Sequence, residues 1–223
     1  MIQPQTTMRP PTPALLTTLF TSLNRPNTPW ILHRILKSDN PLDINGELHG
    51  TATFTPLHKP ATSNNEPATS DILYHEEGSM PTPPGLRTQN MGIGVGLRFT
   101  KKYIWRMAEN GRISVWFAKV GHEDVPDYLF HEFVFKGTEG EGAEGEGETF
   151  VDAPEPPAAG TGEDNTTVLV ARGNHLCIND MYRTAYAFRV RGSGEVVSWA
   201  SRHVVKGPKK NQDIVNLYQL EGA

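Results

Sequence analysis

The strongest constraint on the fold is a period-two alternation of apolar and polar side chains that recurs in ten short segments. These segments are rich in β-branched and aromatic residues and are separated by Gly, Asn, Asp or Pro, which is typical of strands joined by turns. They cover residues 30–37, 46–54, 71–78, 96–107, 111–120, 127–136, 167–178, 181–190, 195–205 and 213–220. The joints at 109–111 and 192–194 are short enough for tight hairpins, so neighbouring segments should pair in an antiparallel sheet.

A sheet with this many strands favours closure. An open sheet leaves its edge strands exposed, and closing it into a barrel removes both edges, although a two-sheet sandwich is an alternative. Apolar spacing near 3.6 residues from Pro13 to Leu23, ending before Pro26, predicts one short amphipathic helix. We therefore predict an all-β protein, an antiparallel barrel of about 8–10 strands with a short N-terminal helix.

Three polar segments interrupt the alternation. Residues 1–12, 57–70 and 137–165 are rich in Pro, Gly, Ser or acidic side chains, so they cannot bury enough apolar surface to offset their chain entropy. We predict a disordered N-terminus at 1–12 and a single β-barrel domain at 13–223, with a polar insert at 57–70 and an acidic Gly/Glu/Pro loop at 137–165 that is a solvated insert. Alternatively, the acidic loop binds a partner protein, and the chain is an interaction scaffold.

Charge and cysteine content narrow the class of protein. The net charge is −4, but residues 137–165 hold nine acidic and no basic side chains, which leaves 21 basic and 16 acidic residues elsewhere. That excess is too small for the clustered basic face that binds nucleic acid. The single cysteine, Cys177, excludes an internal disulfide and favours a reducing compartment, and no stretch approaches the roughly 20 apolar residues of a membrane span. We expect a cytoplasmic protein with no secretory signal and no nucleic-acid partner.

Several short motifs follow one another in a fixed order between Trp30 and Tyr218. They include W-x-L-x-R at 30–34, G-x-x-x-G-x-A-x-F at 46–54, Y-x-W at 103–105, F-H-x-F at 130–133, H-x-C-x-x-D-x-Y at 175–182 and a tryptophan at 199 followed by G-P-K-K at 207–210. This series resembles an uncharacterised family, a domain of unknown function, of small lipocalin- or calycin-like β-barrel proteins. The resemblance implies a lipocalin-like barrel, and it carries no activity that could be transferred, because fold does not determine function.

The parity of the strands indicates which polar side chains face the interior. If Ala52 and Phe54 face inward, then Arg34 and Glu76 also do so. We expect Arg34 and Glu76 to form a buried ion pair, because burying either charge alone would cost several kcal/mol. The alternative role for both residues is ligand binding.

A second polar group lies around the stretch 174–188. Alternation places His175 and Cys177 on one face, and Asp180 and Tyr182 follow closely. His131 lies on an apolar face that also includes Leu129, Phe133 and Phe135, and this face should point to the same interior. These polar residues form either a hydrogen-bonded core network or part of a site.

Three functions suit such an interior. The leading hypothesis is binding of a small hydrophobic or aromatic molecule, because aromatic walls supply contact area and a few polar groups fix orientation. The predicted ligand-binding residues are Arg34, Tyr74, Glu76, Tyr103, Trp105, Phe117, Phe133, Cys177 and Trp199. The second is an acid–base isomerase, cyclase or dehydratase whose catalytic residues would be His131, His175, Asp180 and Tyr182.

The third function is haem or metal binding through His131, His175 and Cys177. The motif spacing of an ordinary four-ligand zinc site is missing around these residues, and neither a cofactor nor a metal is part of the leading hypothesis. The lysines at 209 and 210 read first as a solvated turn. Their alternative role is a basic lip that attracts an anionic head group.

Overall fold

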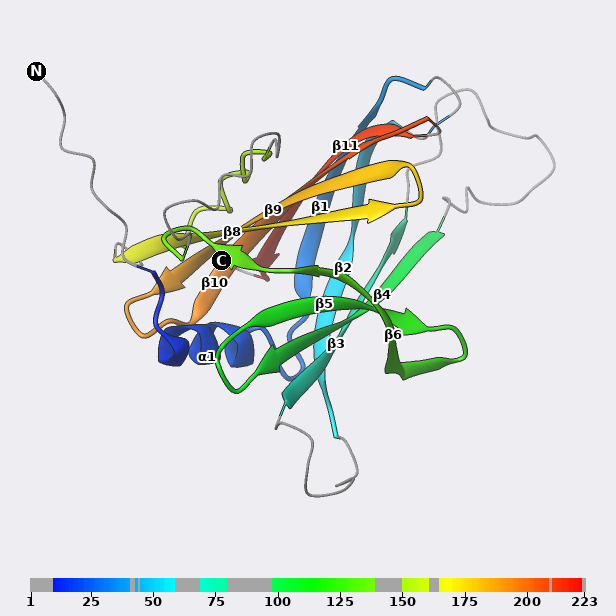
Figure 1. Ribbon diagram of the computed structural model, residues 1–223. Coiled ribbons are helices and arrows are strands. Elements are labelled where there is room, and N and C mark those ends of the chain that lie inside the picture. The colour runs from blue at the N-terminus through cyan, green and yellow to red at the C-terminus, as the bar shows by residue number, and fades with distance from the viewer. Residues whose placement is uncertain are drawn as a thin grey trace, which may run out of the picture.

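The computed structural model describes residues 10–40, 43, 45–58, 69–79, 98–138, 150–160, 165–208 and 210–221. These residues form one helix, α1 (Pro13–Ser22), and eleven strands of a single sheet (Figure 1). The strands are β1 (Trp30–Ser38), β2 (Gly46–Leu57), β3 (Thr69–Ser79), β4 (Arg98–Ala108), β5 (Ile113–Lys119), β6 (His122–Glu132), β7 (Val134–Phe135), β8 (Thr166–Cys177), β9 (Asp180–Arg191), β10 (Val196–Lys206) and β11 (Asn211–Leu220). The prediction of an all-β fold with a short N-terminal helix is confirmed.

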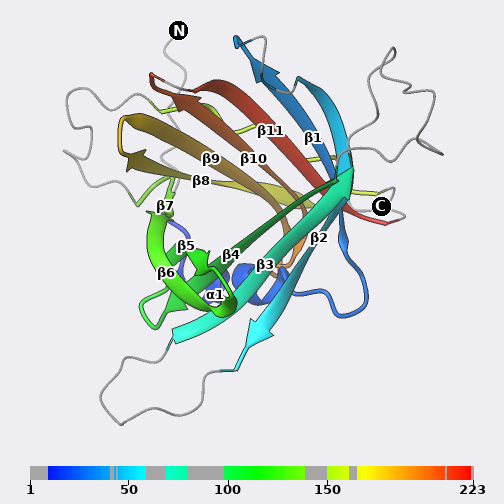
Figure 2. The ribbon, with the colours of Figure 1, turned by 90° about the vertical axis from the view of Figure 1, so that its right-hand side faces the viewer.

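The sheet curls into a nearly closed, antiparallel barrel (Figure 2). Its strand order is β6-β5-β4-β3-β2-β1-β11-β10-β9-β8-β7, so that β6 and β7 lie at opposite edges. These two strands are consecutive in the chain and only Phe133 separates them. One continuous segment therefore leaves one edge of the sheet and pairs with the other edge, which brings the edges together.

A glycine permits the close approach at this seam. A Cβ atom at Gly173 of β8 would lie 2.5 Å from His131 Cδ2 and 2.9 Å from the carbonyl oxygen of Glu132, both on β6. Any larger side chain would push the two strands apart, because heavy atoms do not approach this closely. The absence of a side chain at residue 173 is therefore part of barrel closure.

The helix α1 covers one end of the barrel. Thr12 caps it, since its Oγ1 accepts a hydrogen bond from the Leu15 amide, and Leu16, Leu19 and Phe20 are buried in the core. The Ser22 hydroxyl accepts a hydrogen bond of 3.0 Å from the amide of Val196 and so anchors the helix to β10. The hairpins around Gly111 and Gly194, which both have positive φ, pack against the same helix.

The predicted parity is wrong at one point in β6. The pairing of β5 with β6 shifts register between Val115 and Trp116, so that Phe130 and His131 are both buried although they are adjacent. Leu129, which we expected to face inward with His131, is 38% exposed. A register shift of this kind moves one extra residue to the inner face, and parity alone cannot reveal it.

The described part of the acidic loop lies against the outside of the barrel. Residues 150–160 contain no helix or strand, as expected, but Pro156 is buried. The Pro157 carbonyl oxygen accepts hydrogen bonds from Ser198 Oγ (2.6 Å) and Arg189 Nε (3.0 Å). This part of the loop is thus docked on β9 and β10, which corrects the expectation of a solvated insert. Residues 1–9, 59–68, 139–149 and 161–164, in which the remaining loop predictions fall, lie outside the described residues.

Candidate functional site

The barrel contains a cavity of about 270 Å³. Predicted site residues in its wall are Arg34, Tyr74, Glu76, Tyr103, Trp105, Phe117, Tyr182 and Trp199. Wall residues that were not assigned to the interior from sequence are Lys101, Val115, Phe130, Tyr186, Ser201, His203, Val205, Lys210, Gln212, Ile214, Asn216 and Tyr218. On β4 the cavity wall extends from Trp105, in the core, to Lys101. The helix α1 packs on the hairpin that follows β4, so Lys101, near the start of β4, lies toward the opposite end of the barrel.

The inner part of the cavity is aromatic. Trp199 and Tyr218 stack with 3.5 Å between ring centroids, and Trp105 contacts Trp199 edge-on at 5.9 Å. Tyr103 stacks on Phe130 at 5.8 Å between centroids. Such rings offer flat apolar surface to a guest molecule, and their edges and faces can contact another ring.

A buried polar network crosses the cavity wall. Arg34 Nη2 lies 2.7 Å from Glu76 Oε1 and 2.8 Å from Oε2, so the predicted ion pair is confirmed. The Arg34 Nε donates to Asn216 Oδ1 at 2.5 Å, and Tyr74 donates its hydroxyl proton to Glu76. The Tyr74 and Tyr218 hydroxyls lie 2.8 Å apart.

The pKa values within this network follow from burial and from the ion pair. Burial is the largest single influence on Arg34 and would lower its pKa, but the Glu76 carboxylate, together with Tyr218 and Tyr74, outweighs burial and holds the pKa above its ordinary value. Burial, followed by the charge of Glu76, raises the pKa of Tyr74 well above its usual range. Arg34 is therefore a cation and Tyr74 a neutral phenol at physiological pH, and Glu76 is already occupied by both.

Two lysines add positive charge toward the mouth. Lys101 is exposed and forms no ion pair with any described residue. Desolvation by the surrounding protein, followed by the charge of Arg34, lowers the pKa of its ammonium group. Lys210 Nζ donates a hydrogen bond of 2.6 Å to the Tyr182 hydroxyl, which raises the pKa of Lys210. The lysine that the sequence suggested as part of a basic lip thus lines the cavity.

A histidine also lines this part of the cavity. His203 Nε2 lies 3.2 Å from Ser201 Oγ, and burial, followed by the charge of Lys101, lowers the pKa of His203 well below its ordinary value. The imidazole is therefore neutral at physiological pH, with one ring nitrogen that donates a hydrogen bond and one that accepts. The described cavity wall thus carries three cations and a single carboxylate.

The polar group predicted around residue 175 is only partly assembled. His131 is 2% exposed, and neither of its ring nitrogens has a hydrogen-bond partner among the described residues. Burial, followed by the influence of His175, lowers the pKa of His131 to about 3. Phe133 is a core residue and contacts the Tyr186 ring at 4.5 Å. Neither His131 nor Phe133 forms part of the cavity wall.

The remaining predicted residues lie near the hairpin between β8 and β9. His175 is paired with Tyr182, and Cys177 with Asp180, all four being partly buried. Burial lowers the pKa of His175, and a hydrogen bond with the Phe130 backbone opposes this shift. Among the described residues, no carboxylate contacts His131 or His175. In the same part of the chain, the donor atoms of these two histidines and of Cys177 do not come close enough together to hold a metal ion. The acid–base and metal roles stay predictions.

Residues 27–220 match a family of unknown function, DUF6314. The chain belongs to this family. No curated protein and no solved structure matches the chain. Membership in DUF6314 agrees with the resemblance to an uncharacterised family, whereas the lipocalin-like relationship stays a prediction. Within the described part of this DUF6314 chain, no helix is long and apolar enough to cross a membrane.

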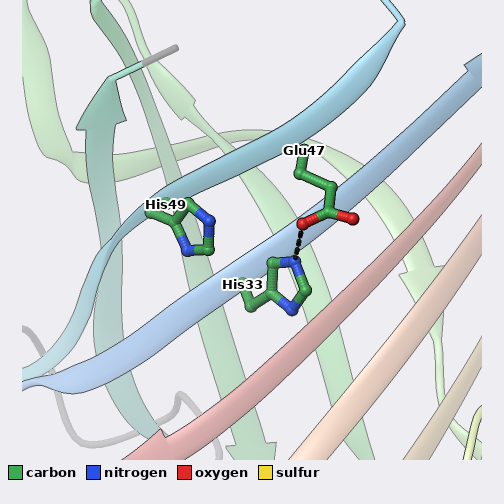
Figure 3. A group of neighbouring side chains, drawn as sticks. All are labelled: His33, Glu47 and His49. Atoms are coloured by element: carbon green, nitrogen blue, oxygen red, sulfur yellow. Dashed lines mark hydrogen bonds and ion pairs between the residues drawn. The ribbon is translucent and has the colours of Figure 1, made fainter. Parts of the chain in front are cut away.

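A separate group of side chains lies on the outer face of the DUF6314 barrel. His33 of β1 and Glu47 and His49 of β2 point toward one another (Figure 3). Sequence reasoning gave the two histidines little weight, because they lie opposite the apolar parity of their segments. Their shared outward parity on adjacent segments was nevertheless the available signal, and only the pairing of the two strands brings their donors together.

Proposed function

We propose that the cavity binds a small organic anion with an aromatic or hydrophobic body. The observation that carries the proposal is the composition of the wall, with aromatic rings inside and the cations Lys101 and Lys210 toward the mouth. A volume of about 270 Å³ is close to the lower end of the range of about 300–1,000 Å³ for ligand pockets. The expected ligand is therefore small, with one ring or two fused rings.

The balance of charge supports an anionic ligand over a neutral one. The only carboxylate in the described wall, Glu76, accepts hydrogen bonds from Arg34 and Tyr74, so it cannot also neutralise the lysines fully. The hydrogen-bond partner of Lys210 is the Tyr182 hydroxyl and not a carboxylate. A carboxylate, sulfonate or phosphate at the mouth would make charge-assisted hydrogen bonds with both ammonium groups, and these are stronger than neutral ones.

Isothermal titration calorimetry with 2-naphthoate and its neutral amide, 2-naphthamide, tests this proposal, since the two probes share one aromatic body. The wild type should bind 2-naphthoate more tightly. Lys101→Met and Lys210→Met keep the apolar stem of the side chain and remove the charge. Each should reduce the preference for the anion by roughly 10–100-fold, as expected for loss of one charged hydrogen bond. Lys102→Met is the matched control, because Lys102 pairs with Glu123 and is absent from the cavity wall.

A variant that fills the cavity separates charge from shape. Val205→Trp introduces an indole into the wall and should weaken both probes to the same degree. If the wild type binds neither 2-naphthoate nor 2-naphthamide, the proposal is wrong. Equal affinities for the acid and the amide would overturn its anionic part, and native mass spectrometry of the freshly purified protein would then show whether a neutral molecule co-purifies.

A further inference from the structure

The pairing of β1 with β2 brings three metal-binding side chains together on the outer face. His33 is directly opposite His49, and Glu47 is opposite Ile35, so Glu47 and His49 lie two residues apart on the same face of β2. Both strands are interior to the sheet, since β1 lies between β11 and β2 and β2 lies between β1 and β3. Hydrogen bonds on both sides therefore hold the backbone of the group.

The three side chains are close to the spacing that a metal ion requires. His33 Nε2 lies 3.1 Å from Glu47 Oε2, and the His33 and His49 rings stack with 4.8 Å between centroids and 5° between planes. One donor atom from each residue lies within 4.8 Å of the others. Bonds of about 2.0–2.2 Å in a tetrahedral zinc site place neighbouring donors about 3.4 Å apart, so the donors must come about 1.4 Å closer. The stacked rings must also turn relative to each other, because the lone pair of an imidazole nitrogen lies in the plane of its ring. Glu47 and His49 are exposed, which leaves space for such a rearrangement.

We propose that His33, Glu47 and His49 bind a divalent transition-metal ion, with zinc as the expected metal. Two imidazoles and one carboxylate suit zinc better than calcium or magnesium, which prefer oxygen ligands. Three protein ligands leave the fourth tetrahedral position to water.

This site is independent of the cavity ligand. His33 is adjacent to Arg34 in β1, but alternate residues of a strand point to opposite faces, and Arg34 lines the cavity. Loss of the metal ligands should therefore leave the affinity for 2-naphthoate unchanged. A change in that affinity would show that the substitutions disturb the barrel as a whole.

The test is titration of tag-free, chelator-treated protein with zinc chloride, followed by calorimetry, and with cobalt chloride, followed by visible absorption. The wild type should bind one ion per chain. His33→Ala and His49→Ala should each weaken binding at least about 10-fold, because even outer-shell changes at metal sites cost about 10–100-fold. His75→Ala is the matched control: His75 is also an interior-strand histidine, and its paired neighbours are Thr53 and Lys102.

Three outcomes would overturn the proposal. The first is that the wild type binds no zinc, and the second is that the double variant His33→Ala/His49→Ala binds zinc as tightly as the wild type does. The third is that binding is lost in Cys177→Ser but not in the double variant, which would assign the ion to the thiol. A thiolate-to-cobalt absorption band would appear only in the third case. Circular dichroism of the metal-free variants checks that these surface substitutions leave the fold intact.

Discussion

Arg34 and Glu76 form a buried ion pair that joins β1 to β3, two strands separated in the sheet by β2. Their side chains are 6% and 2% exposed, so water screens neither charge. The pair is held on both sides, since Asn216 accepts a hydrogen bond from Arg34 and Tyr74 donates one to Glu76. A buried pair of this kind is costly to break, because the remaining charge loses its partner without regaining water.

Arg34→Met should therefore lower the free energy of unfolding by about 3–5 kcal/mol, as should Glu76→Leu, whereas the double variant should recover much of that loss. Urea denaturation of the four proteins gives the coupling energy directly. Arg202→Met is the control, because its pair with Asp213 is about one-third exposed and should contribute less than about 1 kcal/mol. Additive losses in the double variant would contradict a direct interaction between the two side chains.

Gly173→Ala should destabilise the barrel where its edges meet. The new methyl group would overlap the His131 ring and the Glu132 carbonyl group, and overpacking of this kind costs about 1–3 kcal/mol. Gly192→Ala is the matched control, because a methyl group at residue 192 would have no neighbouring atom within 4 Å among the described residues. Hydrogen exchange should show faster opening of β6 and β8 in Gly173→Ala only. If both variants unfold at the same urea concentration, the close approach of the strands is not required for closure.

Strand parity predicted much of the cavity wall on the strands whose pairing has no register shift. Arg34, Tyr74, Glu76, Tyr103 and Trp105 all lie on the paired strands β1, β3 and β4, whose pairing with each other and with β2 shows no register shift. Parity assigns a face, and on these strands the face is enough to place a side chain inside. The prediction of the Arg34–Glu76 pair depended on this regularity.

Parity was less informative for the wall formed by β10. Residues 196–201 of this strand are buried on both faces, since the inner face meets the core and the outer face carries the segment around Pro157. The alternation that marks an inward face is therefore weak. Trp199 was predicted in the wall, whereas Ser201 and His203, two and four residues further along the same face, were not. Parity also says nothing about depth along a strand. For this reason sequence reasoning could not distinguish the position of His131, in the core, from that of Asp180, at a hairpin.

His131 should make the protein less stable in mild acid. Burial lowers the pKa of His131 to about 3 from an ordinary value of 6.5, so the folded protein keeps this imidazole neutral. Below pH 6.5 the unfolded chain binds a proton at residue 131 that the folded protein does not bind. The associated stability is therefore present above pH 6.5 and is lost as pH falls toward 3. Between about pH 7.5 and pH 5 this single group should reduce the free energy of unfolding by about 2 kcal/mol.

His131→Phe removes the titrating group and keeps a ring in the core. The loss of unfolding free energy between these two pH values should therefore be about 2 kcal/mol smaller in this variant than in the wild type. His131→Leu provides the same comparison if the larger phenylalanine ring overpacks against Gly173. Urea denaturation at both pH values, with His122→Phe in the exposed β5–β6 hairpin as the control, measures the difference. If both His131 variants keep the wild-type pH dependence, the His131 imidazole takes up its proton at the same pH in the folded protein as in the unfolded chain. Another buried histidine must then account for any acid sensitivity.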